Sequence, residues 1–163
     1  MKFLHISDLH LEKRLNEFPM IEDQKYILKQ ILSMADRERA DAVFVAGDVY
    51  DKPVPSAEAV QVFDWFLTEL ADRNMTAFVI SGNHDSAERL AFGARLMSGR
   101  GVYVSPVYDG TAEKICLTDG YGELFVYLLP FLKPAVVRHA LMNEPDAQLP
   151  ESCQEAVELA VRR

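Results

Sequence analysis

The chain has 163 residues, 49% of them hydrophobic, which is enough for one domain with a buried core over residues 1–163. Its formal net charge is −8 and its lysines and arginines are scattered, so composition argues against a protein that grips nucleic acid by itself. No apolar run reaches the ~20 residues of a membrane span, and two cysteines are too few for a disulfide framework, which together favour a cytoplasmic location and no membrane partner.

The first half of the chain alternates short apolar runs with helical patterns. Each apolar run is followed at once by polar residues, as expected of strands in a sheet with helical crossovers. Three strands are therefore predicted, at residues 2–6, 42–46 and 77–80.

Two helices are expected between these strands. Apolar residues recur at helical spacing over residues 21–35, and the charged run at 36–39 ends this helix. The second helix begins after Ser56, a favourable N-cap, and extends to about Asp72. Its apolar residues spread over more than one face, so we expect part of it to be buried against something else, such as another subunit.

The second half is richer in β-structure. A helix capped by Asp85 or Ser86 should extend to about Met97. Further elements are then expected: strands at 102–104, 113–117 and 123–129 with a hairpin turn at 119–122, a helix at 135–142, a polar connector at 143–150 and a last helix at 151–163. This order predicts an α/β fold, and no G-x-G-x-x-G follows the first strand to indicate a dinucleotide site.

Polar residues with catalytic potential follow each of the first three strands. They are Asp8 and His10, then Asp48 and Asp51, then Asn83 and His84. Because the carboxyl ends of parallel strands meet at one edge of a sheet, we expect these three loops to converge. One Asp-x-His arises easily by chance, and an aspartate at a strand end often only caps a turn, but three such loops in succession indicate a functional site.

Carboxylate, amide and imidazole ligands together suit manganese, iron or zinc better than calcium. A pair of such metals shares a bridging ligand, a role that a carboxylate can fill, and activates a water for attack on a phosphoryl group. One histidine must then stay off the metals to act on the substrate. His84 is the candidate, because the neighbouring Asn83 can coordinate in its place, and Asp51 is a candidate to orient the His84 ring.

The other histidines and the cysteines have simpler interpretations. His5 is expected to be a hydrogen-bonded core residue of the first strand, and His139 a surface or packing residue of a helix. Cys116 and Cys153 are expected to be chemically inert.

The three motifs resemble those of the calcineurin-like metallophosphoesterase superfamily, D-x-H, then G-D-x-x-D, then G-N-H-D/E. Here they read Asp8-Leu9-His10, Gly47-Asp48-Val49-Tyr50-Asp51 and Gly82-Asn83-His84-Asp85. The residues around them, and the segment Leu128 to Pro134, are similar to the SbcD family of DNA repair nucleases, the bacterial counterpart of the Mre nuclease. The resemblance extends over about residues 1–140.

This resemblance implies a sandwich with helices on the outside and a two-metal manganese site. By the family's pattern Asp8 and His10 hold one metal, Asp48 bridges, Asn83 holds the second metal and His84 serves catalysis. It also implies exonuclease and endonuclease activity on DNA, an SbcC-type ATPase partner, and a homodimer through helices near 56–72 and 86–97.

The sequence departs from the family pattern after His84. The family continues with another metal-binding histidine and a G-H-x-H motif, whereas here only His139 follows, in neither context. Glu12 also stands where the family often has glycine. The chain is therefore expected to be a truncated, N-terminal portion that lacks the C-terminal strands and metal-binding histidines, with a partial or empty metal site and weak or no activity.

Two other functions remain open at this point. A phosphodiesterase or phosphatase acting on small molecules is mildly favoured by the acidic net charge. A non-catalytic dimerisation and partner-binding module is disfavoured, because a decayed site should have lost some of its candidate ligands.

Overall fold

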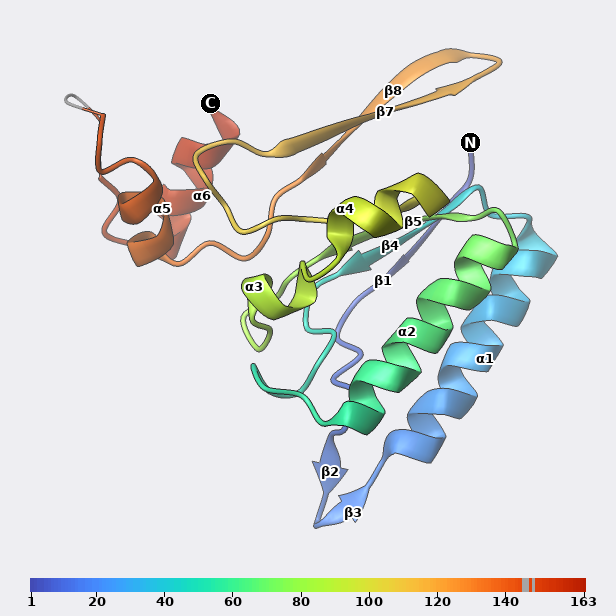
Figure 1. The fold of residues 1–163 in the computed structure, drawn as a ribbon. Coiled ribbons are helices and arrows are strands. Elements are labelled where there is room, and N and C mark those ends of the chain that lie inside the picture. The colour runs from blue at the N-terminus through green and yellow to red at the C-terminus, as the bar shows by residue number, and fades with distance from the viewer. Residues whose placement is uncertain (145–146, 148) are drawn as a thin grey trace.

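The computed structural model describes every residue of the chain except 145–146 and 148 (Figure 1). Its strands are β1 (Phe3–Ile6), β2 (Arg14–Leu15), β3 (Phe18–Pro19), β4 (Ala42–Ala46), β5 (Thr76–Ile80), β6 (Val102–Val104), β7 (Glu113–Asp119) and β8 (Gly122–Leu128). Its helices are α1 (Ile21–Glu38), α2 (Ala57–Asp72), α3 (Ala87–Leu90), α4 (Ala94–Met97), a 3₁₀ turn (Ser98–Arg100), α5 (Pro134–Ala140) and α6 (Cys153–Val161). The α/β prediction and its three leading strands are confirmed.

A parallel sheet with the strand order β1-β4-β5-β6 forms the centre of the molecule. Helices α1 and α2 lie side by side on one face of this sheet, and the β7–β8 hairpin lies toward the other (Figure 1). Alternate strand residues point to opposite faces, so Val43 and Val79 pack with Leu28, Phe66 and Leu70 on the helical side. This arrangement agrees with the expected sandwich that carries helices on its outside.

The second face of the sheet carries a row of aromatic rings. Phe3, Phe44, Phe78 and Tyr103 follow one another across the four strands, with ring centroids 5.0–5.4 Å apart. The hairpin buries the middle of this row, where Phe78 is 1% exposed, but leaves β1 open. His5 is consequently exposed on β1, so its prediction as a core residue is wrong.

Helix α2 begins as predicted, with Ser56 as its N-cap. The Ser56 hydroxyl accepts a hydrogen bond from the backbone N–H of Ala59 at 3.2 Å. Most of the helix's apolar side chains are buried within this one chain, Val62, Phe63, Phe66, Leu67 and Leu70 among them. The breadth of its apolar surface therefore needs no second subunit, because the sheet and the rest of the chain cover it.

Replacing Ser56 with alanine should lower the free energy of unfolding by about 1 kcal/mol, because the first turn of α2 loses its capping acceptor. Urea unfolding measures the change. Ser33→Ala is the matched control, since the Ser33 hydroxyl only bonds back to the carbonyl of Lys29 in its own helix. That control should change stability by no more than about 0.5 kcal/mol. An equal response of the two variants would contradict the capping role.

The helix predicted from residue 85 or 86 to Met97 is not continuous. Ser86 caps α3 by accepting from the N–H of Arg89, but α3 has four residues and α4 begins only at Ala94. Gly93 separates them with φ +76°, a left-handed conformation that interrupts helical hydrogen bonding. The small hairpin β2–β3 was also not predicted, because its strands are only two residues long.

The C-terminal part forms its own cluster. Helices α5 and α6 pack together, with Val137, Leu141, Ala156 and Ala160 in a core that also includes Leu132. The connector predicted at 143–150 falls partly on residues 145–146 and 148, outside the described residues. Within the described residues, none of the helices combines the length and apolarity needed to cross a bilayer.

Candidate metal centre

The loops that follow β1 and β4 lie side by side and continue the parallel pairing of those strands beyond their ends. Backbone N–H groups of the first loop donate to carbonyls of the second from Asp8 to Gly47 at 3.2 Å, His10 to Asp48 at 2.9 Å and Leu11 to Val49 at 2.9 Å. Leu11 also accepts from the N–H of Asp51 at 3.1 Å. The two loops therefore form one rigid unit rather than two independent turns.

Three of the predicted ligands have left-handed backbone conformations. Asp8, His10 and Asp48 have φ values of 57°, 42° and 51°. Such conformations cost energy for non-glycine residues and concentrate at functional sites, where surrounding contacts enforce them. Gly47, at φ +89°, and Gly82 come so close that a Cβ on Gly47 would lie 2.9 Å from Gly82 Cα. This close approach brings the third loop against the first two.

Asp48 lies at the centre of the converging loops. One carboxylate oxygen accepts the backbone N–H of His84 at 3.0 Å, and the other is 3.8 Å from His10 Nε2. The same His10 nitrogen is 3.8 Å from Asp8 Oδ1, while Asp8 Oδ2 accepts from the Ser7 hydroxyl. Asp48 thus spans the space between the first and third loops, a position from which one carboxylate can serve two ions.

Asp51 contacts both imidazoles, but in a way the sequence did not indicate. Its carboxylate faces His10, with Oδ1 3.4 Å from Nδ1, whereas its backbone carbonyl lies 3.1 Å from His84 Nδ1. The expectation that the Asp51 carboxylate orients His84 is therefore corrected, because that carboxylate is directed at the other histidine. The His84 ring is held by the carbonyl oxygen instead.

The side chains present fit a divalent cation. Ligands about 2.1 Å from one ion lie roughly 3–4 Å from one another, which matches the separations around His10 Nε2. The ligand atoms of His10, Asp48 and His84 lie within 4.8 Å of one another. His10 Nδ1 is buried without a hydrogen bond and faces Asp51, as in a metal-bound histidine whose far nitrogen is oriented by a carboxylate.

Asn83 lies in the third loop between Gly82 and His84, and its side chain is exposed. Of the six predicted site residues, the structure brings Asp8, His10, Asp48, Asp51 and His84 into mutual contact. Asn83 belongs to the same loop cluster by its position in the chain. Its coordination of a second ion stays a prediction.

Asp85 is a site residue that the sequence analysis did not assign. Its carboxylate accepts three backbone N–H groups, from Gly82 at 2.8 Å, Val49 at 3.1 Å and Tyr50 at 2.9 Å. These bonds tie the third loop to the second. The signal in the sequence was the last letter of G-N-H-D, which was considered only as a helix cap.

Asp85→Asn should lower the free energy of unfolding by roughly 1–3 kcal/mol, because an amide NH₂ would oppose an N–H donor that the carboxylate now satisfies. Urea unfolding tests this, with the exposed Asp64→Asn on α2 as the charge-matched control. Equal stabilities of the two variants would rule out the clamping role. The affinity for divalent cations should fall in the Asp85 variant only.

Two ionisable groups beside the loops have shifted pKa values. Burial raises the pKa of Tyr50 to about 12, with the negative charges of Asp85 and Asp64 adding to the effect. Burial also raises the pKa of Glu12, but hydrogen bonding to Ser56 and the Lys52 ammonium outweigh it and hold that pKa below its usual value. Tyr50 is therefore neutral and Glu12 ionised at neutral pH.

Comparison with known proteins defines the class of this chain. Residues 1–136 match the family model of the calcineurin-like phosphoesterases, and the chain belongs to this family. It is similar to the SbcD subunit of the nuclease SbcCD from Staphylococcus epidermidis, with 31% identity over 97% of this chain and 41% of that protein. The corresponding protein of Staphylococcus saprophyticus is 30% identical over 80% of this chain and 34% of its own length. The chain thus spans about two fifths or less of the length of these relatives.

Proposed function

We propose that this chain carries part of a metal-dependent active site that hydrolyses phosphodiester bonds in DNA, as an SbcD-type nuclease component in the cytoplasm with an SbcC-type ATPase partner. The observation that carries the proposal is the convergence of Asp8, His10, Asp48 and His84 at the carboxyl edge of the parallel sheet. The family membership and the two nuclease relatives support the substrate class. Manganese is the proposed metal.

His84 would act on the substrate rather than hold the scaffold together. A carbonyl oxygen can only accept a hydrogen bond, so Nδ1 of His84 carries the proton that it shares with the Asp51 carbonyl. This leaves Nε2 available. In the imidazolium form, Nε2 can donate to a phosphate oxygen or to the leaving alkoxide, which is general-acid catalysis.

A bound cation would supply Lewis acidity, lowering the pKa of a coordinated water and neutralising charge on the phosphoryl group. The residues that would hold it are Asp8, His10 and Asp48, with Asn83 as the proposed ligand of a second ion. The other two histidines, His5 and His139, are exposed and outside this cluster. With so few imidazole ligands, we expect this chain to bind cations weakly and to have little or no activity by itself.

Titration calorimetry with Mn²⁺ tests the metal, and cleavage of a DNA duplex and of a single strand tests the reaction. Binding that is lost in Asp48→Ala would support the site. Cleavage should be weak or absent with this chain and should depend on Mn²⁺ where it occurs. Robust cleavage by the chain alone would overturn the expectation of weak activity, and cleavage insensitive to chelation would overturn the metal-dependent mechanism.

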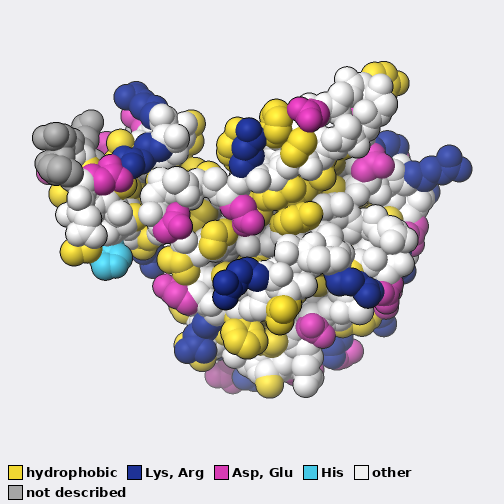
Figure 2. Space-filling view, turned by 45° about the horizontal axis from the view of Figure 1, so that its top comes forward, with side chains coloured by type: hydrophobic (Ala, Val, Ile, Leu, Met, Phe, Trp, Pro, Cys, Tyr) yellow, Lys and Arg dark blue, Asp and Glu magenta, His cyan; other side chains and the backbone are white. Residues whose placement is uncertain are grey.

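A phosphodiesterase or phosphatase for small molecules is the second candidate. The net charge of −8 favours it, and on the face drawn in Figure 2 the described basic side chains are dispersed among acidic ones. A nucleotide monoester and a DNA duplex, compared at equal Mn²⁺ concentration, separate the two functions. Faster turnover of the monoester would favour this candidate.

A non-catalytic module for dimerisation and partner binding is the third candidate. The presence of all the predicted ligands argues against it. If the paired replacement of Asp48 and His84 left the function of the complex unchanged, the module would be the better explanation.

The proposed homodimer has support around α3 and α4. Phe92 is 87% exposed and Leu96 is 85% exposed, values unusual for large apolar side chains. Sedimentation of the chain should reveal a dimer that Phe92→Ser with Leu96→Ser converts to a monomer. Phe131→Ser, at another exposed apolar side chain, should leave the dimer intact. A monomeric parent chain would refute the homodimer.

A further inference from the structure

Gln24, on the first turns of α1, makes more polar contacts with the first loop than any residue that the sequence motifs identify. Its side-chain NH₂ donates to the carbonyls of Leu9 at 3.0 Å and His10 at 2.7 Å. Its side-chain oxygen accepts the backbone N–H of Glu12 at 3.0 Å. The amide therefore uses both its donor and its acceptor groups on the loop that holds Asp8 and His10.

The conformation of this loop makes those bonds important. Asp8, His10 and Glu12 alternate as left-handed residues, with φ values of 57°, 42° and 70°. A backbone with three such residues in five positions is costly for L-amino acids and persists only where its polar groups are held. Gln24 binds two carbonyls and one N–H within this short stretch.

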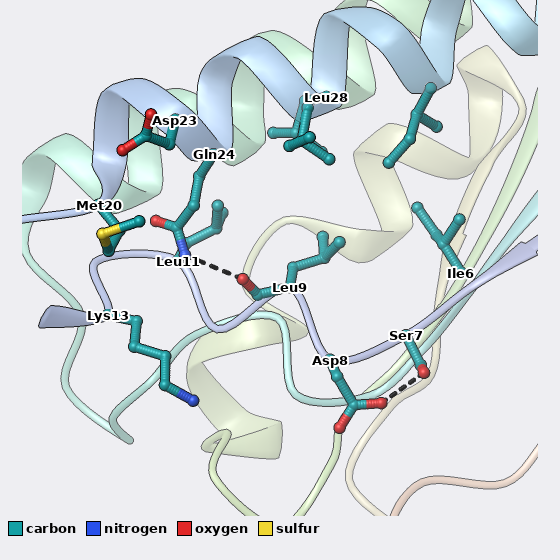
Figure 3. A pocket seen from close by; sticks show the side chains of 12 residues that line it. Ile6, Ser7, Asp8, Leu9, Leu11, Lys13, Met20, Asp23, Gln24 and Leu28 are labelled. Atoms are coloured by element: carbon teal, nitrogen blue, oxygen red, sulfur yellow. Dashed lines mark hydrogen bonds between the residues drawn. The ribbon is translucent and has the colours of Figure 1, made fainter. Parts of the chain in front are cut away.

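Packing does little of this holding on the side of α1. A cavity of about 490 Å³ lies between the loop and the helix (Figure 3). It is lined chiefly by apolar side chains from both sides, including Leu9, Leu11, Met20, Ile27 and Ile31. Figure 3 shows the Gln24 side chain reaching from the helix to the loop beside this space. The amide is thus a direct tie where close packing is missing.

Glu12 extends the same chain of contacts to the next helix. Its N–H is bound by Gln24, and its carboxylate accepts from the backbone N–H of Ser56, the N-cap residue of α2, at 2.8 Å. The Glu12 side chain is 14% exposed and lies 3.7 Å from the Lys52 ammonium. The left-handed φ of Glu12 suits a glycine, and these bonds compensate for its side chain.

We propose that Gln24 is a positioning residue that holds Leu9, His10 and Glu12 in the left-handed loop geometry, so that Asp8 and His10 face the cation. The proposal rests on the proposed metal site and adds to it a residue on α1 that touches neither the cation nor the substrate. Gln24 acts through the backbone of the loop, as outer partners of metal ligands commonly do.

Two variants of Gln24 separate geometry from charge. Gln24→Met keeps the length of the side chain and removes all three hydrogen bonds. Gln24→Glu keeps the acceptor for Glu12 but sets a carboxylate against two carbonyl oxygens. Charge alone predicts tighter Mn²⁺ binding to the Glu variant, because it adds a negative charge near a cation site. Positioning predicts weaker binding to both variants, by about 10-fold or more.

Gln30→Met and Gln30→Glu are the matched controls, since Gln30 is an exposed residue of the same helix. Calorimetry with Mn²⁺ should find them within about twofold of the parent chain. Tighter binding by Gln24→Glu, or parent-like binding by Gln24→Met, would overturn the proposal. Urea unfolding identifies any variant whose loss of binding comes from global unfolding.

Amide hydrogen exchange gives a readout that does not depend on metal. In Gln24→Met the Glu12 N–H should exchange at least 10-fold faster, whereas the Leu11 N–H, bound to the Val49 carbonyl, should keep its protection. Unchanged exchange at Glu12 would contradict the proposal even if the parent chain bound no Mn²⁺. A parent chain without Mn²⁺ binding but with this exchange pattern would instead count against the proposed function alone.

Discussion

Replacing Asp48 with alanine is expected to abolish measurable Mn²⁺ binding by this chain. The Asp48 carboxylate is the contact between the first loop, through His10 Nε2 at 3.8 Å, and the third loop, through the His84 N–H at 3.0 Å. Removing even an outer partner of a metal ligand costs about 10–100-fold in affinity, so loss of a central ligand should exceed that range. Calorimetry measures the affinity, and any Mn²⁺-dependent cleavage should fall by roughly 10²–10³-fold or more.

Asp72→Ala is the control for this experiment. Asp72 is an exposed aspartate at the end of α2 that pairs with Arg100 at 3.4 Å, and its removal changes the net charge by the same amount. It should leave Mn²⁺ affinity unchanged within about twofold, because exposed ion pairs contribute little and the charge lies outside the loop cluster. Retained binding in Asp48→Ala would show that the cation is held elsewhere.

Gly82→Ala should damage the same site without removing any ligand. A Cβ on Gly82 would overlap the carboxylate oxygen and the backbone nitrogen of Asp48 and would lie 2.7 Å from its Cγ. Because Asp48 is itself held by the first and third loops, the overlap can be relieved only by displacing it. We expect the Mn²⁺ affinity to fall by about 10–100-fold. The free energy of unfolding should fall by roughly 1–3 kcal/mol, the cost of overpacking.

Gly99→Ala is the matched control, since a Cβ there would meet nothing within 4 Å and its φ is not left-handed. This variant should be neutral or slightly more stable, because alanine restricts the unfolded chain more than glycine does. Urea unfolding and Mn²⁺ calorimetry on both variants provide the comparison. If Gly82→Ala bound Mn²⁺ like the parent chain, the loops would have to be able to move apart at little cost.

The sequence predicted the parts of the fold that depend on local pattern. The strands at the centre of the sheet were readable because apolar runs such as 42–46 and 77–80 have polar residues directly after them. The start of α2 was readable because Ser56 is a good N-cap. The predicted helix up to Met97 was wrong, because Gly93 takes a left-handed φ that periodicity does not reveal. His5 was misjudged because its exposure depends on how far the β7–β8 hairpin extends over the second face of the sheet.

The sequence by itself determined the residue types of the site and their order along the chain, because D-x-H, G-D-x-x-D and G-N-H-D each follow a strand of a parallel sheet. Only the tertiary structure decided how those residues are oriented. Asp51 directs its carboxylate at His10 and its carbonyl at His84, a division set by the backbone path of the second loop. The bonds from Gln24 and Asp85 to loop amides and carbonyls were likewise invisible, because they bind backbone groups that every residue carries. The site therefore depends on a motif for its chemistry and on packing between distant segments for its geometry.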